Sequence, residues 1–519
     1  MNTHTVSTRC WLPLVLFATT CALCLCVYLP ALRGPFVFDD IFEIESNPAL
    51  GSLWPPFKAM ISPGGFPSRP LPYYSFAVSR ALHGLDPLGW KLTNLAIHLL
   101  NGALVWLVIK RLPRLDASTG EAWAAATVWL LHPLCTQPVA YIYQRMELLG
   151  ATAILAALAC FLSFRSGGGL AATVAVSAIG MLCKETAAAI PPLIALTDWL
   201  LVNWRPDRPW ASLWVTVRQR WPFYACLFAT LGVAACLVAI QSGSYREFTA
   251  PVWSPLAYAS TQPLIILHYL RLTAWPAGQC FDYGWPAASN SLTIAGGFTA
   301  LACTIAVAFR CVSRQPLAAY AIVSFLLLLA PSSSVVPVND ICVEHRMYLP
   351  LVVPVTAGVI TVGRHVSGLH HGSMLRRVLL VMVLAAEVAV ASSRTAVYES
   401  MIALWSDTAA KVPRNQRALL WKGIALSDAG RDEQAFSTFA ATIAADPENP
   451  VCARAHAFRA AMLGKAGDYP GALAEASRAV ALNPADSIGW NNLSQALRAV
   501  GRFEDATAAA KKAADGRRH

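Results

Sequence analysis

The sequence predicts an all-α protein with many membrane-spanning helices, followed by a solenoid of helical repeats. Of its 519 residues, 56% are hydrophobic and only 13% are charged, whereas soluble domains carry about 25% charged residues. Apolar runs of the kind that cross a bilayer as helices recur from residue 11 to residue 393. From residue 398 onward they give way to short amphipathic segments with a repeating pattern of small residues.

The first apolar run, residues 11–31, allows two interpretations. A cleaved signal peptide is one, but the run is long and many spans follow it, which favours an uncleaved first helix. The next residues, 33–91, then form a polar loop on the far side of the membrane. Within this loop, residues 68–82 have the pattern of an amphipathic helix at the membrane interface.

Charge asymmetry fixes the predicted topology. The segment 255–276 is ambiguous because it contains three prolines, His268 and Arg271. If this segment does not cross, every short Arg-rich loop falls on the side of the N-terminus, as the positive-inside rule requires. We therefore predict about eleven spans and a re-entrant or interfacial 255–276. The ten spans after the first are 92–110, 121–140, 147–164, 169–183, 186–203, 221–241, 292–310, 316–331, 347–363 and 375–393.

This topology collects polar residues on the outer face, although none of them was used to choose it. Such convergence of positions far apart in the sequence indicates a functional pocket. The residues are Asp39, Asp40, Arg69, His132, Arg145, Glu147, Lys184, Glu185, Arg271, Asp282, Glu344, His345 and Arg346.

The acidic pair Asp39-Asp40 is the strongest candidate within this set. Acidic pairs at helix ends often only solvate a loop, and that reading stays open. Against it, these carboxylates lie among Phe36, Phe38 and Phe42 at the membrane surface, where partial desolvation is unfavourable and raises a carboxylate pKa. A raised pKa suits a general base.

The second candidate is the Glu344-His345-Arg346 segment. An arginine at the start of a helix on the outer face can hold a phosphate through two hydrogen bonds, while an ion pair with Glu344 or Asp340 is the alternative. Lys184-Glu185 occupies a very short connection, which favours a functional pair modestly.

Two sets of polar residues within the spans are read as structural or left unassigned. Asn94, His98 and Asn101 form a stripe on one helix face, more typical of contacts between helices than of a site. Glu387 lies in the last span, and no partner can be assigned to it.

The C-terminal region repeats with the period of tetratricopeptide (TPR) helix pairs. Gly and Ala are spaced alike around Ala435, Ala472 and Ala506, and the last two are 34 residues apart. The first interval is 37 residues, which predicts a short insertion near residues 448–450. A generic helical tail is the alternative.

Composition argues against other classes. The net charge of +11 is spread over loops without a dense basic run, so we expect no nucleic-acid partner. Most of the 14 cysteines lie in apolar runs and are expected to pack as small apolar residues. We predict no structural metal and no firm cofactor; a catalytic divalent ion is not expected.

A base and phosphate-binding cations beside a membrane suit one reaction. When a hydroxyl attacks a sugar on polyprenyl phosphate, the nucleophile must lose its proton. The phosphate leaves as a good anion, so it needs charge stabilisation more than an acid. Glycoside hydrolysis differs, because two carboxylates flank the bond.

Ordered motifs along nearly the whole chain resemble the TPR-containing C-type (GT-C) glycosyltransferases. The nearest in pattern are transmembrane-and-TPR protein O-mannosyltransferases and bacterial pilin glycosyltransferases. The motifs are Phe36-Val37-Phe38-Asp39-Asp40, Asn47-Pro48, Arg69-Pro70-Leu71, His83-Gly84-Leu85-Asp86-Pro87, Asn94-Leu95-Ala96-Ile97-His98, His132-Pro133, Lys184-Glu185, Glu344-His345-Arg346-Met347-Tyr348-Leu349-Pro350 and the repeat tail.

The resemblance implies a GT-C fold over residues 1–397 and a TPR domain over 398–519 on the outer face. It also implies a polyprenyl-phosphate monosaccharide donor and Ser/Thr acceptors on exported proteins. The implied catalytic residues are Asp39 and Asp40. We assign Glu344, His345, Arg346, Lys184 and Arg271 to the donor phosphate. We assign Arg69, His132, Arg145, Glu147, Asp282, Tyr283, Asp340 and Tyr348 to the acceptor and sugar pocket.

One departure from the family pattern leaves the sugar and the acceptor open. Relatives usually carry an acidic residue and an Arg-Lys-Asp-like run in the third outer segment. Here the corresponding stretches read Gln137-Pro138-Val139 and Gln144-Arg145-Met146-Glu147.

The sequence therefore predicts a glycosyltransferase of a bacterial inner membrane that works on the periplasmic face, with an exported protein, such as a pilin, bound through the TPR array. Three alternatives remain: a TPR scaffold for an envelope assembly, a transporter of lipid-linked sugars, and a glycosyltransferase acting on an envelope glycan or lipid. A transporter would place polar groups deep in several spans, and apart from His98 and Glu387 these spans are apolar.

Overall fold

The computed structural model describes residues 12–60, 69–244 and 253–515, which form helices and loops with no β-strand among them. The chain divides into two compact units. The first comprises Met1–Gln279 and Trp285–Glu399, and the second comprises Cys280–Gly284 and Ser400–His519. The predicted all-α class is confirmed.

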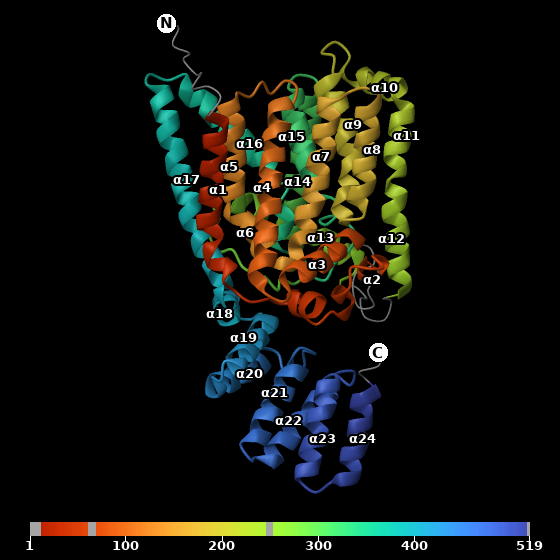
Figure 1. The fold of residues 1–519 in the computed structure, drawn as a ribbon, viewed down its shortest axis with the longest axis vertical. Helices are drawn as coiled ribbons and strands as arrows, with labels where there is room; N and C mark the ends of the chain where they lie inside the picture. Colours follow the sequence, from red (N-terminus) through yellow and green to blue (C-terminus); the bar gives the residue numbers. More distant parts are fainter. Residues whose placement is uncertain (1–11, 61–68, 245–252, 516–519) are drawn as a thin grey trace. The chain divides into compact units, whose positions relative to one another are not determined.

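All eleven apolar runs lie in helices of the first unit (Figure 1). These are α1 (Leu12–Leu32), α4 (Pro87–Arg111), α5 (Thr119–Leu131), α7 (Arg145–Ser163), α8 (Gly167–Met181), α9 (Ile190–Thr197) with η6 (Asp198–Val202), α11 (Trp221–Ala229) with α12 (Leu231–Ser244), α14 (Ser291–Val312), α15 (Pro316–Leu329), α16 (Val352–Ser367) and α17 (Gly372–Ala396).

Six helical segments of the described chain are long and apolar enough to cross a membrane. They are Leu14–Leu32, Pro87–Arg111, Ile142–Ser163, Glu185–Val202, Trp221–Ile240 and Ser291–Val312. Helices α8, α15 and α16 are apolar but shorter.

The predicted span 121–140 is not one helix. Helix α5 ends at Leu131, and Pro133–Cys135 and Thr136–Ala140 form the short helices η3 and α6. His132 is extended, with ψ of 132°, because the residue before a proline avoids the helical region. The ambiguous segment 255–276 forms α13 (Pro255–Ala274), a helix that continues through Pro263.

Short elements cap the two ends of the helix bundle in the first unit. Helices α2 (Phe57–Met60) and α3 (Pro70–His83) lie at one end, and α10 (Pro209–Gln219) lies at the other (Figure 1). Helix α3 is the predicted amphipathic helix, and its buried face includes Tyr73 and Phe76. Helix α3 therefore packs against the end of the bundle through these aromatic side chains.

The polar stripe of α4 contacts neighbouring helices, as predicted. The ring nitrogens of His98 lie 2.8 Å from the Tyr348 hydroxyl and 2.9 Å from the carbonyl oxygen of Leu130. The Asn101 amide donates to the carbonyl of Leu148 at 3.0 Å. All polar groups in these contacts are buried, where unpaired atoms would be destabilising.

The second unit consists of α18 (Met401–Lys411) and three helix pairs. The pairs are α19 (Gln416–Asp428) with α20 (Asp432–Ala445), α21 (Cys452–Lys465) with α22 (Tyr469–Leu482), and α23 (Ser487–Ala499) with α24 (Phe503–Asp515).

Glycine makes the turn inside each helix pair. Gly430, Gly467 and Gly501 have φ of 71°, 84° and 81°, the left-handed conformation that glycine adopts readily after a helix. Ala435, Ala472 and Ala506 are at most 2% exposed, and their small size lets the paired helices approach. Six residues separate α20 from α21, but only four separate α22 from α23. The predicted insertion near residues 448–450 therefore lies in the loop between α20 and α21.

Candidate active site

A tight turn after α1 presents Asp39 and Asp40. The Asp40 amide donates to the carbonyl of Val37 at 2.9 Å, and Phe38 has a φ of 51°. The left-handed conformation is unfavourable for a side chain of this size and is typically kept at functional turns. The turn directs two consecutive carboxylates into different surroundings.

Asp40 holds the turn in place. It is fully buried, and its two carboxylate oxygens accept hydrogen bonds from the amides of Val37 at 3.0 Å and Tyr143 at 2.7 Å. Burial raises the pKa of Asp40 to about 7, although these amides and nearby Lys91 favour the ionised form. The Lys91 ammonium itself donates to the carbonyls of Ala31 and Gly34, at 2.8 Å each.

Asp39 is half-buried, and a phenol orients it. The Tyr141 hydroxyl donates to Asp39 Oδ2 at 2.5 Å, and the Asp39 amide donates to the same hydroxyl oxygen at 3.3 Å. Tyr141 is 3% exposed, so its position is set by packing. Asp39 therefore has the fixed geometry and the partial access that a general base requires.

Two ion pairs lie at the same end of the bundle, of which Arg69–Glu185 is partly exposed and Lys184–Glu147 is buried. Arg69 Nε lies 3.1 and 3.2 Å from the two carboxylate oxygens of Glu185, and Lys184 Nζ lies 3.0 Å from Glu147 Oε1. Glu147 is on the first turn of α7, and Lys184 and Glu185 lie in the turn between α8 and α9. The structure thus brings these four predicted residues together.

Two tyrosines and Glu43 connect the acidic turn with the ion pairs. The Tyr73 hydroxyl donates to Glu43 Oε2 at 2.5 Å and lies 3.4 Å from the Tyr143 hydroxyl. Burial raises the pKa of Glu43; the Tyr73 hydrogen bond lowers it, the charge of Asp39 raises it and Arg69 lowers it. Glu43 therefore lies within electrostatic range of both Asp39 and Arg69.

His345 belongs to this cluster as well. Its amide donates to Gln137 Oε1 at 3.0 Å, and its Nδ1 lies 3.3 Å from the same oxygen. Burial lowers the pKa of His345 well below its usual value, and the charges of Lys184, Arg346 and Arg69 lower it further. His345 therefore lies within electrostatic range of three cations.

Arg346 and Glu344 are engaged in holding their own loop. Arg346 Nη1 donates to the carbonyl of Ile341 at 2.8 Å, and Nη2 donates to the carbonyl of Asp340 at 2.5 Å. The fully buried Glu344 accepts from Gln279 at 3.1 Å and lies 3.8 Å from Arg394. Arg346 thus fixes the loop that carries His345, and the predicted pairing of Arg346 with an acidic side chain is replaced by contacts with backbone carbonyls.

Several predicted pocket residues serve packing instead. Arg145 is fully buried and its guanidinium donates to Asn94, Ser75, Ser79 and Trp90. The Tyr348 hydroxyl lies in the bundle core against His98. His132 Nε2 lies 3.2 Å from the carbonyl of Thr273. The amino-acid types of these residues could not show whether they line a pocket or pack between helices, because a buried polar group needs partners in either case.

Three more predicted residues do not join the cluster by any described contact. Arg271 is exposed and donates to the carbonyl of Ala277 at 3.3 Å. Asp282 and Tyr283 belong to the second unit, where Arg417 Nη2 lies 2.8 Å from Asp282 Oδ1. Asp282 thus stabilises the start of the repeat array.

Sequence reasoning missed the residues that orient Asp39 and link the cluster. These are Tyr141, Tyr143, Tyr73, Glu43, Gln137 and Lys91. The pair Tyr141-x-Tyr143 in an apolar stretch was the available signal, because buried tyrosine hydroxyls need partners. Nothing in the sequence connects Lys91 with the turn at residues 34–40.

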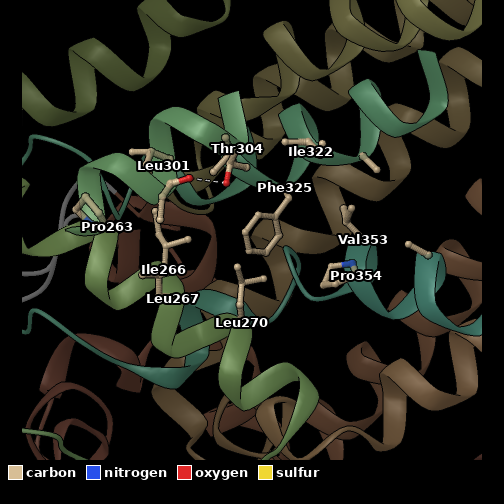
Figure 2. A pocket seen from close by; sticks show the side chains of 15 residues that line it. Pro263, Ile266, Leu267, Leu270, Leu301, Thr304, Ile322, Phe325, Val353 and Pro354 are labelled. Atoms are coloured by element: carbon tan, nitrogen blue, oxygen red, sulfur yellow. Dashed lines mark hydrogen bonds between the residues drawn. The ribbon is translucent and has the colours of Figure 1, made fainter. Parts of the chain in front are cut away.

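An apolar cavity opens between α13, α14, α15 and α16 (Figure 2). Its volume is about 270 Å³. Figure 2 shows Leu267, Leu270, Leu301 and Phe325 around it, and Thr304 Oγ1 donates to the carbonyl of Ala300 within its own helix. The cavity therefore suits a hydrocarbon chain.

No metal site accompanies the cluster in the part of the chain described. Within residues 12–60, 69–244 and 253–515, no group of three or more His, Cys, Asp or Glu side chains is arranged to hold an ion.

Comparison with known proteins supports the predicted resemblance. Residues 398–450 and 462–518 match the family model described as Tetratricopeptide repeat. The chain is 32% identical to Protein O-mannosyl-transferase Tmtc1 of Drosophila melanogaster over 306 residues, which are 53% of this chain and 35% of that protein. Human Protein O-mannosyl-transferase TMTC3 is 24% identical over 298 residues, or 49% of this chain and 31% of that protein. The chain thus spans about a third of the length of these relatives.

Two solved structures are also similar, at low identity. ArnT from Cupriavidus metallidurans bound to undecaprenyl phosphate is 15% identical, with a TM-score of 0.39 over 97% of this chain and 88% of that chain. The Archaeoglobus fulgidus oligosaccharyltransferase tethered with an acceptor peptide is 12% identical, with a TM-score of 0.43 over 82% of this chain and 59% of that chain.

Proposed function

We propose that this chain is a C-type membrane glycosyltransferase that moves a monosaccharide from polyprenyl phosphate to a Ser or Thr hydroxyl of an exported protein. Its relatives over half of the chain are named protein O-mannosyl-transferases. The observation that carries the proposal is that one end of the bundle holds both Asp39, oriented by Tyr141, and the ion-paired cations Arg69 and Lys184. A base and phosphate-binding cations are the two groups that this transfer needs.

In the proposed reaction, Asp39 accepts the proton of the acceptor hydroxyl. The hydroxyl oxygen forms a bond to the anomeric carbon, and the bond between that carbon and the phosphate oxygen breaks. The electron pair leaves on polyprenyl phosphate, whose added charge Arg69 and Lys184 stabilise. Tyr141 and Asp40 act as positioning residues, because Tyr141 orients the Asp39 carboxylate and Asp40 holds the turn.

We keep Lys184 at the phosphate, add Arg69, which the sequence had assigned to the acceptor and sugar pocket, and remove Arg346. Arg346 is already bound to two carbonyls and to the Tyr258 hydroxyl, whereas Arg69 and Lys184 face carboxylates. An incoming phosphate can share cations with Glu185 and Glu147, which keep them in place before the donor arrives.

The apolar cavity is proposed to receive part of the isoprenoid chain. Helix α13 lines it with Leu267 and Leu270, and through Tyr258 and Tyr269 the same helix contacts Ser332 and Val343 of the loop that leads to His345. One helix thus borders both the cavity and the loop of the polar cluster.

We further propose that the reaction occurs on the periplasmic face of a bacterial inner membrane. The TPR array is proposed to bind the acceptor protein, and a pilin is one candidate acceptor. Stacked helix pairs present an extended concave surface that suits a peptide.

The direct test uses purified full-length protein, an acceptor peptide and two series of donors. Polyprenyl-phosphate monosaccharides should support transfer to Ser or Thr, and nucleotide sugars should not. Leu267→Trp, which fills the cavity, should weaken use of a long-chain donor about ten-fold or more while sparing a short-chain analogue, because it blocks burial of hydrocarbon. Exposed Leu292→Trp is the matched control. Absence of transfer from every lipid-linked donor, with retained binding of envelope proteins, would favour the scaffold alternative.

A further inference from the structure

Helix α10 lies at the bundle end opposite α2 and α3 (Figure 1), and an apolar stripe along it is exposed. Trp210, Trp214 and Val217 recur at positions i, i+4 and i+7, which places them on one side of a helix. Trp214 is 77% exposed, while Ser212 and Thr216 on the opposite side are 3% and 1% exposed. Helices on soluble surfaces have the reverse arrangement.

The inward hydroxyl face of α10 is satisfied locally. Ser212 donates to the carbonyl of Pro209 at 2.7 Å, and Thr216 donates to the carbonyl of Ser212 at 2.8 Å. Neither side chain needs a partner from the bundle. The outward direction of the tryptophans is therefore compatible with a well-satisfied helix.

Contacts at the start of α10 hold it in this orientation. Trp199 Nε1 donates to the carbonyl of Pro209 at 2.9 Å. The Trp210 ring stacks on Phe309 of α14 with ring centroids 5.6 Å apart. Because these contacts fix the first turn, the exposure of Trp214 and Val217 is a property of the fold.

Arginines surround this stripe. Arg205, Arg208 and Arg218 are exposed. Asp207 lies 3.9 Å from Arg208, but both side chains are largely exposed to solvent, so the pair is weak. Arg220 is committed to the buried carboxylate of Asp198 at 3.1 Å. Three cations thus remain beside the apolar stripe.

We propose that α10 lies in the headgroup layer of the membrane and binds anionic phospholipid, with Trp210 and Trp214 at the acyl boundary and the three arginines on headgroup phosphates. Tryptophan favours this boundary, and arginine matches phosphate geometry. An acidic soluble protein would explain the arginines but leave the tryptophans uncovered. The inference does not depend on the proposed transferase activity.

The test measures lipid binding to the delipidated full-length protein in neutral detergent by native mass spectrometry. Wild type should bind phosphatidylglycerol in preference to phosphatidylcholine. Each cation near an anionic surface contributes about 1 kcal/mol, or about five-fold. The combined variant Arg205→Gln, Arg208→Gln, Arg218→Gln should therefore lose on the order of 100-fold in apparent affinity for phosphatidylglycerol.

The matched control removes three exposed arginines on other elements of the first unit, at Arg33, Arg376 and Arg377. It should bind phosphatidylglycerol nearly as wild type does. An equal loss in both triple variants would overturn the proposal, because binding would then follow total charge rather than α10.

Trp214 provides a second readout that does not depend on affinity. In vesicles that contain phosphatidylglycerol with brominated acyl chains, wild type should lose more fluorescence than the Trp214→Ser variant. Equal quenching of the two proteins would contradict insertion of α10. Cross-linking of α10 to a second copy in vesicles would instead assign the apolar stripe to a dimer and refute the lipid assignment. Full competition by glycerophosphoglycerol, which lacks acyl chains, would refute membrane insertion in favour of a simple anion site.

Discussion

Replacing Asp39 by Asn should abolish most transfer activity while leaving the fold intact. Asn keeps the size of the side chain and an oxygen that can accept the Tyr141 hydrogen bond at Oδ2, but it cannot take a proton. General-base assistance typically contributes 10²–10⁴-fold, so the activation barrier should rise by about 3–5 kcal/mol. The free energy of unfolding should fall by only about 1–2 kcal/mol, because one hydrogen bond to a charged group becomes a neutral one.

Single-turnover transfer with saturating donor separates these effects from donor binding. Donor affinity should stay within a few-fold of wild type, because the phosphate is assigned to Arg69 and Lys184. Glu45→Gln is the matched control, since Glu45 is an exposed acid in the same segment, and it should transfer at the wild-type rate. A rate for Asp39→Asn within two-fold of wild type would refute the assignment of the base.

Three further predictions concern the groups that support this site. Asp40 has a pKa raised from 3.8 to about 7, so its ionisation should lower the free energy of unfolding as pH rises from about 4 to 7, by on the order of 4 kcal/mol. The stability of wild type relative to Asp40→Asn, which does not titrate, should fall by about the same amount over that window, and a constant difference would contradict the burial argument. Arg145→Met should lower the free energy of unfolding by about 3–5 kcal/mol, since four partners of this buried arginine lose their donor. The exposed Arg431→Met should change it little, and equal effects would contradict the packing role. Arg346→Lys should lower the melting temperature and transfer together, because one ammonium cannot reproduce the two carbonyl contacts; a loss of donor affinity with unchanged stability would restore the direct phosphate role.

The helical spans and the repeat array were predictable because each depends on local sequence. A bilayer requires a run of apolar residues with satisfied backbone groups, so composition alone reports a span. The TPR period was likewise visible in Gly430, Gly467 and Gly501, whose turns need a left-handed conformation. The break at His132-Pro133 was the main error, although Pro133 itself was the signal.

The sequence predicted which residues lie on the same membrane face as the site, but not which of them contact each other. Positive-inside topology brought Asp39, Arg69 and Lys184 to one face, and in the structure Glu43, bonded to Tyr73, lies within electrostatic range of Asp39 and Arg69. Topology could not tell which cations face the cluster. Arg145 and Arg69 have the same charge and the same predicted face, but Arg145 is enclosed by Trp90 and Phe76. That difference comes from side-chain packing between helices far apart in sequence.

The choice between Asp39 and Asp40 shows why a raised pKa alone does not identify a base. Burial brings the pKa of Asp40 to about 7, which would suit a general base. Both of its oxygens, however, are occupied by amides of the turn and of Tyr143, so it cannot approach an acceptor hydroxyl without releasing the turn. Asp39 is half-buried, and its carboxylate accepts a hydrogen bond from the Tyr141 hydroxyl. Access therefore selects Asp39, and the neighbouring acid supplies the rigidity that a positioned base needs.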